Sequence, residues 1–303
     1  MDKILRCEKI RKVFIVKDFL GVNKRTTVAL NDISINIEKG LNTGIVGESG
    51  SGKTTLARTM LLLIKPDAGS VYYREKEITH LSDNNLRDFR SKVRIIFQNP
   101  YKSLNPRLTI ERTIKEALPS CDSHKQKVED ILAQVGIPKT YRTKYPHQLS
   151  GGERQRIAIA RALAGIPECV IADEPTGNLD ATTEVHILRL LEKLKEKFNL
   201  TYVFISHNLK IVSDICNKIA VMYKGRIVEE GDACDVSKNP LHPYTKALWN
   251  PDIAQPIDEK QTKYSEGCAF IDSCTSRKER CFCENPEIIE KEKNHSVACF
   301  LYE

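Results

Sequence analysis

One short glycine-rich stretch constrains the fold of this 303-residue chain more than any other feature, namely Gly47-Glu48-Ser49-Gly50-Ser51-Gly52-Lys53-Thr54. It has the GxxxxGK[ST] spacing, in which a tightly curled backbone points its N–H groups inward around phosphates. The apolar residues 43–46 before it predict a buried strand, and residues 55–62 after it predict a helix whose positive end faces the phosphates. This strand, loop and helix predict an α/β fold that binds a nucleotide through its phosphates.

The same spacing predicts roles for individual residues of this phosphate loop. Lys53 is expected to reach the β- and γ-phosphates, and the Thr54 hydroxyl is expected to coordinate Mg²⁺. The residues expected to contact the nucleotide here are Gly47, Glu48, Ser49, Gly50, Ser51, Gly52, Lys53, Thr54 and Thr55. The motif alone predicts phosphate binding and assigns no reaction.

Composition and charge favour a large folded chain in the cytosol. A chain of 303 residues can bury about three quarters of its unfolded surface. The net charge of +7 arises from 47 basic and 40 acidic residues that are interspersed, which favours a solvated surface over a nucleic-acid site. No apolar run approaches the roughly 18 residues that span a bilayer, and residues 1–6 lack a signal-peptide core.

The hydrophobic pattern places further elements around the phosphate loop. Residues 28–37 alternate apolar and polar, which predicts an antiparallel edge sheet. Residues from about 100 to 163 are charged and helix-rich with Gly and Pro breaks, which predicts a helical subdomain that interrupts the α/β core. Short apolar runs at 169–172 and 201–205 flank an amphipathic helix at 181–198, the pattern of a parallel sheet with a crossover helix.

The composition changes beyond about residue 235. Residues 219–223 and 226–230 predict a last hairpin, after which prolines and cysteines become frequent. We therefore expect a domain at 1–235 and an extension at 236–303. Of the ten cysteines, five crowd the extension, and five are scattered and expected to be small core residues. The scattered ones are Cys7, Cys121, Cys169, Cys216 and Cys234.

A carboxylate pair follows the predicted strand at 169–172. Asp173 is expected to hold Mg²⁺, directly or through water, and Glu174 to polarise the attacking water as the general base of phosphoryl transfer. The alternative is that this Asp-Glu-Pro sequence merely caps the next helix. The upstream phosphate loop favours the catalytic interpretation.

A further motif gives the chain a family resemblance. Residues 149–156, Leu-Ser-Gly-Gly-Glu-Arg-Gln-Arg, resemble the signature motif of ATP-binding cassette (ABC) ATPases. Their distances from the phosphate loop and from Asp173 and Glu174 are also similar to those of the family. The resemblance implies a P-loop NTPase fold with a RecA-like core, an antiparallel β subdomain and a helical subdomain.

The resemblance implies roles for residues in the family's order. They are Phe14 for stacking on adenine, Gln98 as the lid-loop glutamine that contacts Mg²⁺ and water, Leu179-Asp180 as the dimer-contact loop, and His207 as the switch histidine on the γ-phosphate. Taken alone, Phe14 would be a core residue and His207 a helix cap. Stacking on an aromatic ring would add affinity with little base specificity.

The signature motif complements the phosphate loop. Ser150 with Gly151 and Gly152 begins a helix, so this helix start offers a second set of N–H donors to a γ-phosphate. It lies almost 100 residues from Lys53, so one chain cannot easily present both to one ATP. The resemblance implies a head-to-tail dimer, with two ATP molecules between the loop of one subunit and the signature of the other.

Two segments narrow the resemblance to the ATPases of the oligopeptide, dipeptide and nickel uptake group. Residues 96–107 are similar to the group's lid-loop region, and residues 239–248 to its C-terminal region. With Tyr145-Pro146-His147, they make the chain similar to the second of two ATP-binding subunits in such importers. The implied partners are a different, homologous ATPase, two permeases and, indirectly, an external substrate-binding protein, with no nucleic acid. The chain would lie on the cytoplasmic face of the membrane.

Residues 98–107 are expected to help form the groove for a permease coupling helix, with an ordinary proline-rich loop as the alternative. Three positions depart from the family: Glu153 stands where Gln is usual, and Gly177-Asn178 stand where this group more often has Thr-Ala. The latter is closer to lipoprotein-release exporters. An exporter subunit, a nucleic-acid-associated ATPase and a catalytically silent partner stay open as alternatives. The chain lacks a second cassette, which argues against the nucleic-acid class, and Glu174 and His207 argue against a silent partner.

The cysteines of the extension resemble a metal site of the same group. Cys268, Cys274, Cys281 and Cys299 have a spacing similar to the extension that binds a [4Fe-4S] cluster in some members. Four thiolates are the usual ligand set of such a cluster. Zinc takes the same ligands, although its structural sites usually show tighter CxxC pairs. Free thiols are the third interpretation, and Cys283 is expected to lie outside the set.

Overall fold

The computed structural model describes residues 2–17, 24–118, 124–177, 179–250 and 267–303. These residues form two compact units, one of Met1–His80 with Phe204–Glu303 and one of Leu81–Val203. The chain returns to the first unit within strand β8 (Thr201–Ser206). Of the residues singled out above, Cys121 and Asn178 lie outside the described residues. The predicted boundary at residue 235 stays a prediction.

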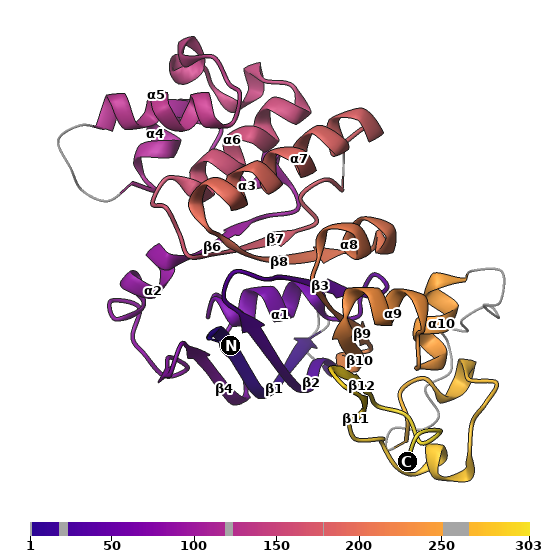
Figure 1. Ribbon diagram of the computed structural model, residues 1–303. Coiled ribbons are helices and arrows are strands. Elements are labelled where there is room, and N and C mark those ends of the chain that lie inside the picture. The colour runs from indigo at the N-terminus through magenta and orange to yellow at the C-terminus, as the bar shows by residue number, and fades with distance from the viewer. Residues whose placement is uncertain (1, 18–23, 119–123, 178, 251–266) are drawn as a thin grey trace. The chain divides into compact units, whose positions relative to one another are not determined.

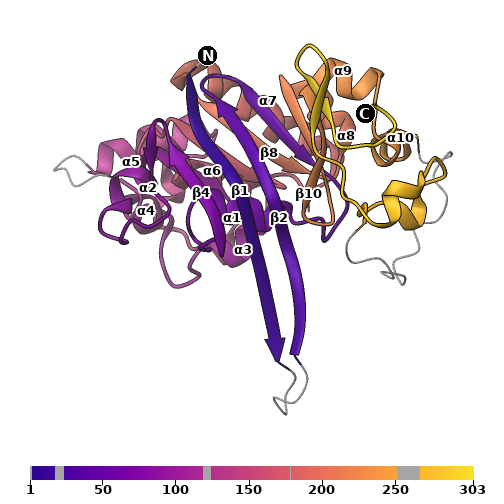
Figure 2. The same ribbon diagram turned by 90° about the horizontal axis from the view of Figure 1, so that it is seen from below.

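The first unit contains the predicted antiparallel sheet. Its strands are β1 (Lys3–Lys17), β2 (Lys24–Glu38), β4 (Ala68–Tyr73) and β5 (Lys76–Glu77), in the order β2-β1-β4-β5. Ile33, Ile35 and Ile37 alternate along β2 and are at most 4% exposed, so one face of this sheet lies on a core. Figure 2 shows β1 and β2 as a long hairpin that projects beyond β4.

A second sheet in this unit carries the phosphate loop. It has the order β11-β12-β10-β9-β3, with β3 (Asn42–Val46) parallel to β9 and the other pairs antiparallel. The remaining strands are β9 (Lys218–Tyr223), β10 (Arg226–Asp232), β11 (Ile289–Glu292) and β12 (His295–Val297). Lys224 and Gly225 both have positive φ, 41° and 79°, the geometry of a tight hairpin turn. The predicted β9–β10 hairpin is confirmed, whereas the sequence did not predict β11 and β12.

Short helices complete the first unit. They are α1 (Lys53–Met60), α8 (Leu209–Ile215), α9 (Ala233–Lys238), α10 (Pro243–Trp249), and 3₁₀ turns at Ile271–Ser273 and Glu279–Phe282. Helix α1 follows β3 directly after the glycine-rich loop, as predicted. In the described part of the chain, no helix combines the length and apolarity needed to cross a membrane.

The second unit combines parallel strands with most of the longer helices (Figure 1). Its elements are α2 (Leu86–Lys92), β6 (Val93–Ile96), α3 (Pro100–Ser103), α4 (Ile110–Lys115), α5 (His124–Gln134), α6 (Gly151–Leu163), β7 (Cys169–Asp173) and α7 (Ala181–Phe198), with 3₁₀ turns at Lys139–Thr143 and Pro146–Gln148. The strands lie in the order β8-β7-β6, and β6 is parallel to β7.

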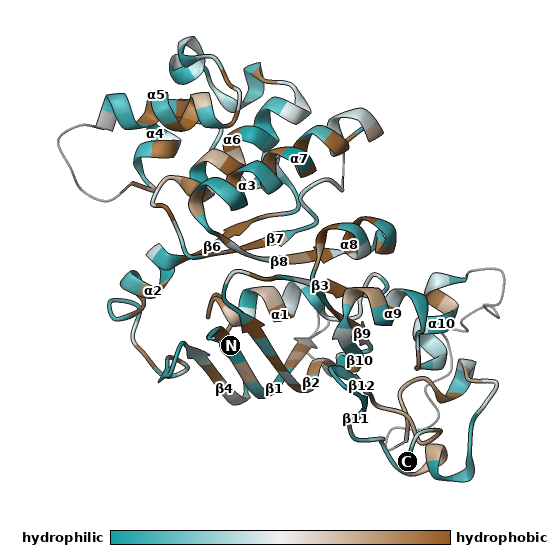
Figure 3. Ribbon diagram, in the orientation of Figure 1, coloured by the Kyte–Doolittle hydropathy of each residue, from teal (hydrophilic) through white to brown (hydrophobic). Residues whose placement is uncertain are grey.

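The predicted crossover helix at 181–198 is α7, residue for residue. Its buried residues Ile187, Leu190, Leu191 and Leu194 recur at intervals of three and four, so they form one apolar stripe. All five residues of β7 are buried, and the strand is hydrophobic over most of its length in Figure 3. A strand buried on both faces is typical of a parallel sheet covered by helices.

The scattered cysteines are mostly core residues. Cys7, Cys169 and Cys216 are buried, and burial raises the pKa of the Cys7 and Cys169 thiols to about 12. The prediction for Cys234 is wrong, because this side chain is exposed. It lies on the short helix α9, where Ala233 and Val236 supply the buried side chains.

Candidate functional site

The phosphate loop has the curled backbone that its glycines predict. Gly47, Gly50 and Gly52 have φ values of 149°, 83° and 105°. A Cβ atom on Gly47 would lie 2.1 Å from the Met222 carbonyl oxygen. A Cβ on Gly52 would lie 2.4 Å from the Ala29 carbonyl oxygen. Because both close neighbours are backbone atoms, the loop requires glycine at these two positions.

Lys53 points into this curl. Its side chain is part of a residue only 6% exposed, and Nζ donates hydrogen bonds to the carbonyl oxygens of Gly47 and Glu48, each at 2.7 Å. Ser51 Oγ lies 3.4 Å from the same nitrogen. A buried ammonium at the start of helix α1 creates a positive site inside the loop, which suits an anion such as phosphate.

A residue that the sequence did not single out for this loop contacts it. Tyr244, on α10, accepts a hydrogen bond of 2.9 Å at its hydroxyl from the Glu48 backbone N–H. Tyr244 was noted only as part of a segment similar to one transporter group, and nothing local in the sequence indicates contact with a residue 196 positions away.

The carboxylate pair lies in the second unit. Asp173 ends β7 and is 2% exposed. Glu174 follows with φ of 45°, an unfavourable left-handed conformation for a residue other than glycine and one that is enriched at functional sites. Its Oε2 accepts a 2.6 Å hydrogen bond from Gln98 Nε2. The predicted lid-loop glutamine and the predicted general base are therefore in contact.

The helix-capping alternative for this pair is wrong. Helix α7 is capped by Asp180, whose Oδ1 accepts from the Thr183 N–H at 2.9 Å. This hydrogen bond lowers the pKa of the Asp180 carboxyl. The residue predicted for the dimer-contact loop therefore also has a structural role, because it fixes the start of α7.

His207 and Phe14, both in the first unit, are accessible side chains. His207 is exposed after β8, and α8 is capped by Asn208, whose side chain accepts from the Ile211 N–H at 3.3 Å. Phe14 is 36% exposed, with the Lys12 ammonium 5.7 Å from its ring centroid. Neither the cap interpretation of His207 nor the core interpretation of Phe14 is therefore correct.

Ser150 begins α6 as the signature motif predicts. Its Oγ accepts from the Glu153 N–H at 3.2 Å, while Glu153 Oε2 accepts from the Ser150 N–H at 2.8 Å, so the two residues form a capping box. The Ser150 N–H holds the pKa of the Glu153 carboxyl below its usual range. The Ser150 N–H is thus already hydrogen-bonded to the Glu153 carboxylate. The first N–H groups of the helix itself are those of Gly151 and Gly152.

Several predicted residues of the second unit surround one cavity of about 220 Å³. Its lining includes Gln98, Gly151, Arg154, Gly177 and Leu179. The structure therefore brings the lid loop, the signature helix and the predicted dimer-contact loop to one place. Tyr101, which follows on α3, is 59% exposed and lies with its ring centroid 5.0 Å from the Arg154 guanidinium. The role of residues 98–107 in permease docking stays a prediction.

The four predicted cysteines share a second, mainly apolar cavity of about 10 Å³. Cys268, Cys274, Cys281 and Cys299 all line it. Burial raises the pKa of the Cys268 thiol to about 11, and the other three thiols add to this effect. Among the described residues, no three His, Cys, Asp or Glu side chains are close enough to hold one metal ion. The thiols are neighbours without converging on one point.

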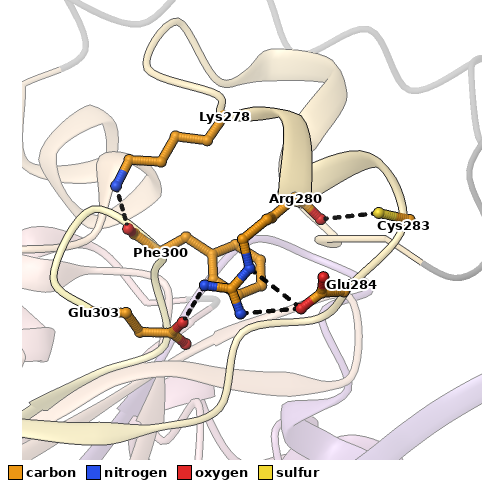
Figure 4. A network of polar contacts seen from close by, with 6 residues as sticks. All are labelled: Lys278, Arg280, Cys283, Glu284, Phe300 and Glu303. Carbon is orange, nitrogen blue, oxygen red and sulfur yellow. Dashed lines mark hydrogen bonds and ion pairs between the residues drawn. The ribbon is translucent and has the colours of Figure 1, made fainter.

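Basic residues of the extension have structural contacts (Figure 4). Lys278 Nζ donates to the Phe300 carbonyl oxygen at 2.6 Å. Arg280 pairs with Glu284 at 3.0 Å and with Glu303 at 2.8 Å, and its guanidinium stacks 4.4 Å from the Phe300 ring centroid. These contacts fasten the end of the chain around the cysteine cavity. Cys283 is exposed and donates to the Arg280 carbonyl, so it lies outside the cysteine set, as predicted.

The fold and the loop define a class of protein. Residues 30–177 match the family model "ABC transporter", and residues 228–281 match "Oligopeptide/dipeptide transporter, C-terminal region". The chain is therefore an ATPase with an ABC-type cassette. More particularly, it belongs to the family of ABC transporter ATP-binding proteins that carry the oligopeptide/dipeptide C-terminal region.

Known proteins of this family are similar to the chain over most of its length. The chain is 38% identical to the oligopeptide transport ATP-binding protein AppF of Bacillus subtilis, over 99% of this chain and 98% of that protein. It is 35% identical to the dipeptide transport ATP-binding protein DppF of Escherichia coli, over 98% and 94% of the two. The dimeric post-hydrolysis structure of the ATP-binding cassette MJ0796, bound to ADP and Pi, matches with a TM-score of 0.68 and 29% identity. That match covers 76% of this chain and 98% of the cassette.

Proposed function

We propose that this chain hydrolyses ATP on the cytoplasmic face of a membrane importer for oligopeptides or dipeptides. The observation that carries the proposal is an ABC-type cassette joined in one chain to the C-terminal region of oligopeptide/dipeptide transporters. The relatives that match over nearly the whole chain are named as oligopeptide and dipeptide transport proteins. Selection of the cargo would take place on the substrate-binding protein and the permeases, so this chain would supply the energy.

In this proposal the first unit binds the triphosphate. The positive site inside the loop supports a role for Lys53 on the β- and γ-phosphates, with the N–H groups of residues 47–55 around them. Phe14 would stack on the adenine, and His207 would contact the γ-phosphate. Mg²⁺ bound by Thr54, Gln98 and Asp173 would neutralise charge that develops on the phosphate oxygens.

Glu174 would act as the general base. It would accept a proton from the water that attacks the γ-phosphorus, while the bond to the β–γ bridging oxygen breaks and leaves ADP and inorganic phosphate. The hydrogen bond from Gln98 and the strained backbone of Glu174 support this role, because both fix the direction of the carboxylate.

The N–H groups of Gly151 and Gly152, with Ser150, would complete the site of a second ATPase subunit. A helix start with a capping box is a rigid set of N–H donors that suits a γ-phosphate. The dimeric state of the MJ0796 cassette supports such pairing. We expect the partner to be a different, homologous ATPase, so the pair would be a heterodimer.

The cysteine cavity would hold a [4Fe-4S] cluster. The donor set fits, since four thiols line one cavity and four thiolates are the ligands of such a cluster. Zinc takes the same thiolate ligands and is the alternative that metal analysis separates from the cluster. The open space is small, so the thiol side chains must turn outward to admit a cluster.

Purification from membranes tests the proposal. The chain carrying an affinity tag is extracted in mild detergent, and we expect it to bring two permeases and one second ATPase. Reconstituted with a peptide-binding protein, the complex should take up peptide in an ATP-dependent manner, and Lys53→Ala should abolish uptake while assembly persists. Recovery with a nucleic acid or a ribosome, or without any permease, would overturn it.

A further inference from the structure

Tyr244 joins the extension to the phosphate loop. Its side chain is completely buried on α10, and its hydroxyl oxygen accepts the Glu48 N–H at 2.9 Å. Glu48 is the second residue of the loop, at the point where the chain leaves β3 and begins to curl. The contact lies entirely within the first unit.

The peptide group between Gly47 and Glu48 is therefore held from both ends. Its carbonyl oxygen accepts from Lys53 Nζ at 2.7 Å, and its N–H donates to Tyr244. A peptide group is planar, so fixing the N–H also fixes the direction of the carbonyl that receives Lys53. The orientation of the lysine ammonium is thus linked to a phenol that the extension supplies.

Tyr244 is itself rigidly placed. Its backbone N–H donates to His242 Nδ1 at 3.0 Å. Its ring centroid lies 4.4 Å from that of Tyr223 and 5.5 Å from that of Phe270, within the range of attractive ring contacts. Burial raises the pKa of the Tyr244 phenol, so the hydroxyl stays protonated and neutral.

The start of α10 is anchored in turn by a buried carboxylate. Glu229, on β10, is 0% exposed and accepts from the N–H groups of Leu241 at 2.8 Å and His242 at 2.7 Å. His295 Nε2, on β12, lies 2.7 Å from the same carboxylate. Strand β10, strand β12 and the residues before α10 are therefore joined through one carboxylate. This fixes the start of the helix that carries Tyr244.

We propose that Tyr244 is a positioning residue for ATP binding. By holding the Gly47–Glu48 peptide it keeps the empty phosphate loop in the shape that receives the triphosphate, so less ordering is needed when ATP binds. Removing the hydroxyl takes this partner from the Glu48 N–H, so the peptide group is fixed less firmly than in the parent chain, although Lys53 still holds its carbonyl oxygen. The inference rests on the proposed assignment of residues 47–55 to the phosphates.

The test compares two identical substitutions in one ring cluster. Tyr244→Phe removes only the hydroxyl that holds Glu48. Tyr223→Phe removes a hydroxyl from the adjacent ring, which makes no hydrogen bond to the loop among the residues that the structure describes. We expect the Kd of the full chain for Mg-ATP to rise roughly three- to tenfold in Tyr244→Phe, and less than twofold in Tyr223→Phe. Amide hydrogen exchange of the peptide covering residues 47–54 should become faster in Tyr244→Phe alone.

Equal Kd values for Tyr244→Phe and the parent chain, or equal losses in both variants, would overturn the inference. Lys53→Ala separates this result from failure of the assignment itself, because unchanged ATP binding there would mean that the loop does not bind phosphate. Phe270→Leu provides a second variant if Tyr244→Phe does not fold. It keeps the phenol but removes the ring behind it, and a two- to threefold weaker affinity is expected.

Discussion

Gln98 Nε2 donates a 2.6 Å hydrogen bond to Glu174 Oε2, which joins residues 76 positions apart in the second unit. Glu174 has the left-handed backbone conformation at the same time, with φ of 45°. The position of the carboxylate therefore depends on a glutamine that follows strand β6 and on the turn after β7. Any movement of the lid loop would be transmitted directly to the proposed general base.

Replacing Glu174 by Gln should separate turnover from binding. The amide keeps an oxygen that can accept from Gln98 but has no basicity, so we expect ATP turnover by the assembled complex to fall at least about 100-fold. The Kd for ATP should stay within about twofold. Glu184→Gln is the matched control, since its Oε1 only accepts from Thr176 Oγ1 at 2.7 Å and should leave turnover unchanged. Persistent turnover in Glu174→Gln would mean that the partner's sites hydrolyse the ATP.

The four cysteines that line the cavity should be needed for iron binding, and Cys283 should not. After anaerobic purification, Cys274→Ser should lose iron and the visible absorption of the chain, because it removes one of four thiolates around the cavity. Cys283→Ser should retain both, since this exposed thiol lies outside the set. Iron analysis and a visible spectrum check the result. A colourless chain loaded with zinc would contradict the cluster.

The two signature glycines should differ in their tolerance of a methyl group. A Cβ on Gly152 would lie 2.8 Å from Thr183 Cγ2, and Thr183 cannot turn away without losing the 2.7 Å bond from its Oγ1 to Asp180. Gly152→Ala should therefore lower the free energy of unfolding by about 1–2 kcal/mol. Gly151→Ala has its nearest neighbour, Leu179 Cδ2, at 3.7 Å and should be neutral or stabilising. Thermal unfolding of both variants checks this, and equal midpoints would disprove the contact.

His242 should make the first unit less stable in acid. Burial lowers the pKa of this imidazole from 6.5 to about 3, with a smaller contribution from Lys246. Between these values the unfolded chain binds a proton that the folded chain does not, so stability falls as pH decreases. The slope from this group approaches about 1.4 kcal/mol per pH unit, and above about pH 6.5 its effect disappears.

His242→Asn should flatten that slope, because an Asn at this position keeps an acceptor for the first turn of α10 and cannot titrate. Urea unfolding at pH 7, 6 and 5, followed by the fluorescence of Trp249, measures it, since this is the sole tryptophan and lies on α10. His80→Asn, at an exposed position, should keep the slope of the parent chain. Identical slopes in all three proteins would exclude His242 as the source.

The sequence predicted correctly those elements whose pattern lies within a few neighbouring residues. Helix α7 and the β9–β10 hairpin follow from periodicity and from turn residues that lie within a few positions of one another. The glycines and lysine of the phosphate loop are equally local, because their spacing alone fixes the curl.

Long-range polar contacts could not be predicted in this way. Glu229 is a charged residue within the predicted hairpin at 226–230, and it is fully buried because His295 and two N–H groups near residue 241 satisfy its carboxylate. The charged segment at 289–292 has no alternating pattern, and it forms β11 because β12 offers it a partner. The contact between Tyr244 and Glu48 is also a long-range polar contact, since only the folded chain brings the two residues together.

The first unit is assembled from the two ends of the chain, whereas the second is one uninterrupted stretch. During synthesis on the ribosome, Leu81–Val203 can complete its packing while the remainder is still being made. Glu229 can contact His295 only after residue 295 has been synthesised. The start of α10, which the Glu229 carboxylate anchors, is therefore completed at the same late stage. A nascent chain therefore completes the anchor of α10, and with it the placement of Tyr244 beside the phosphate loop, only when strand β12 has been made.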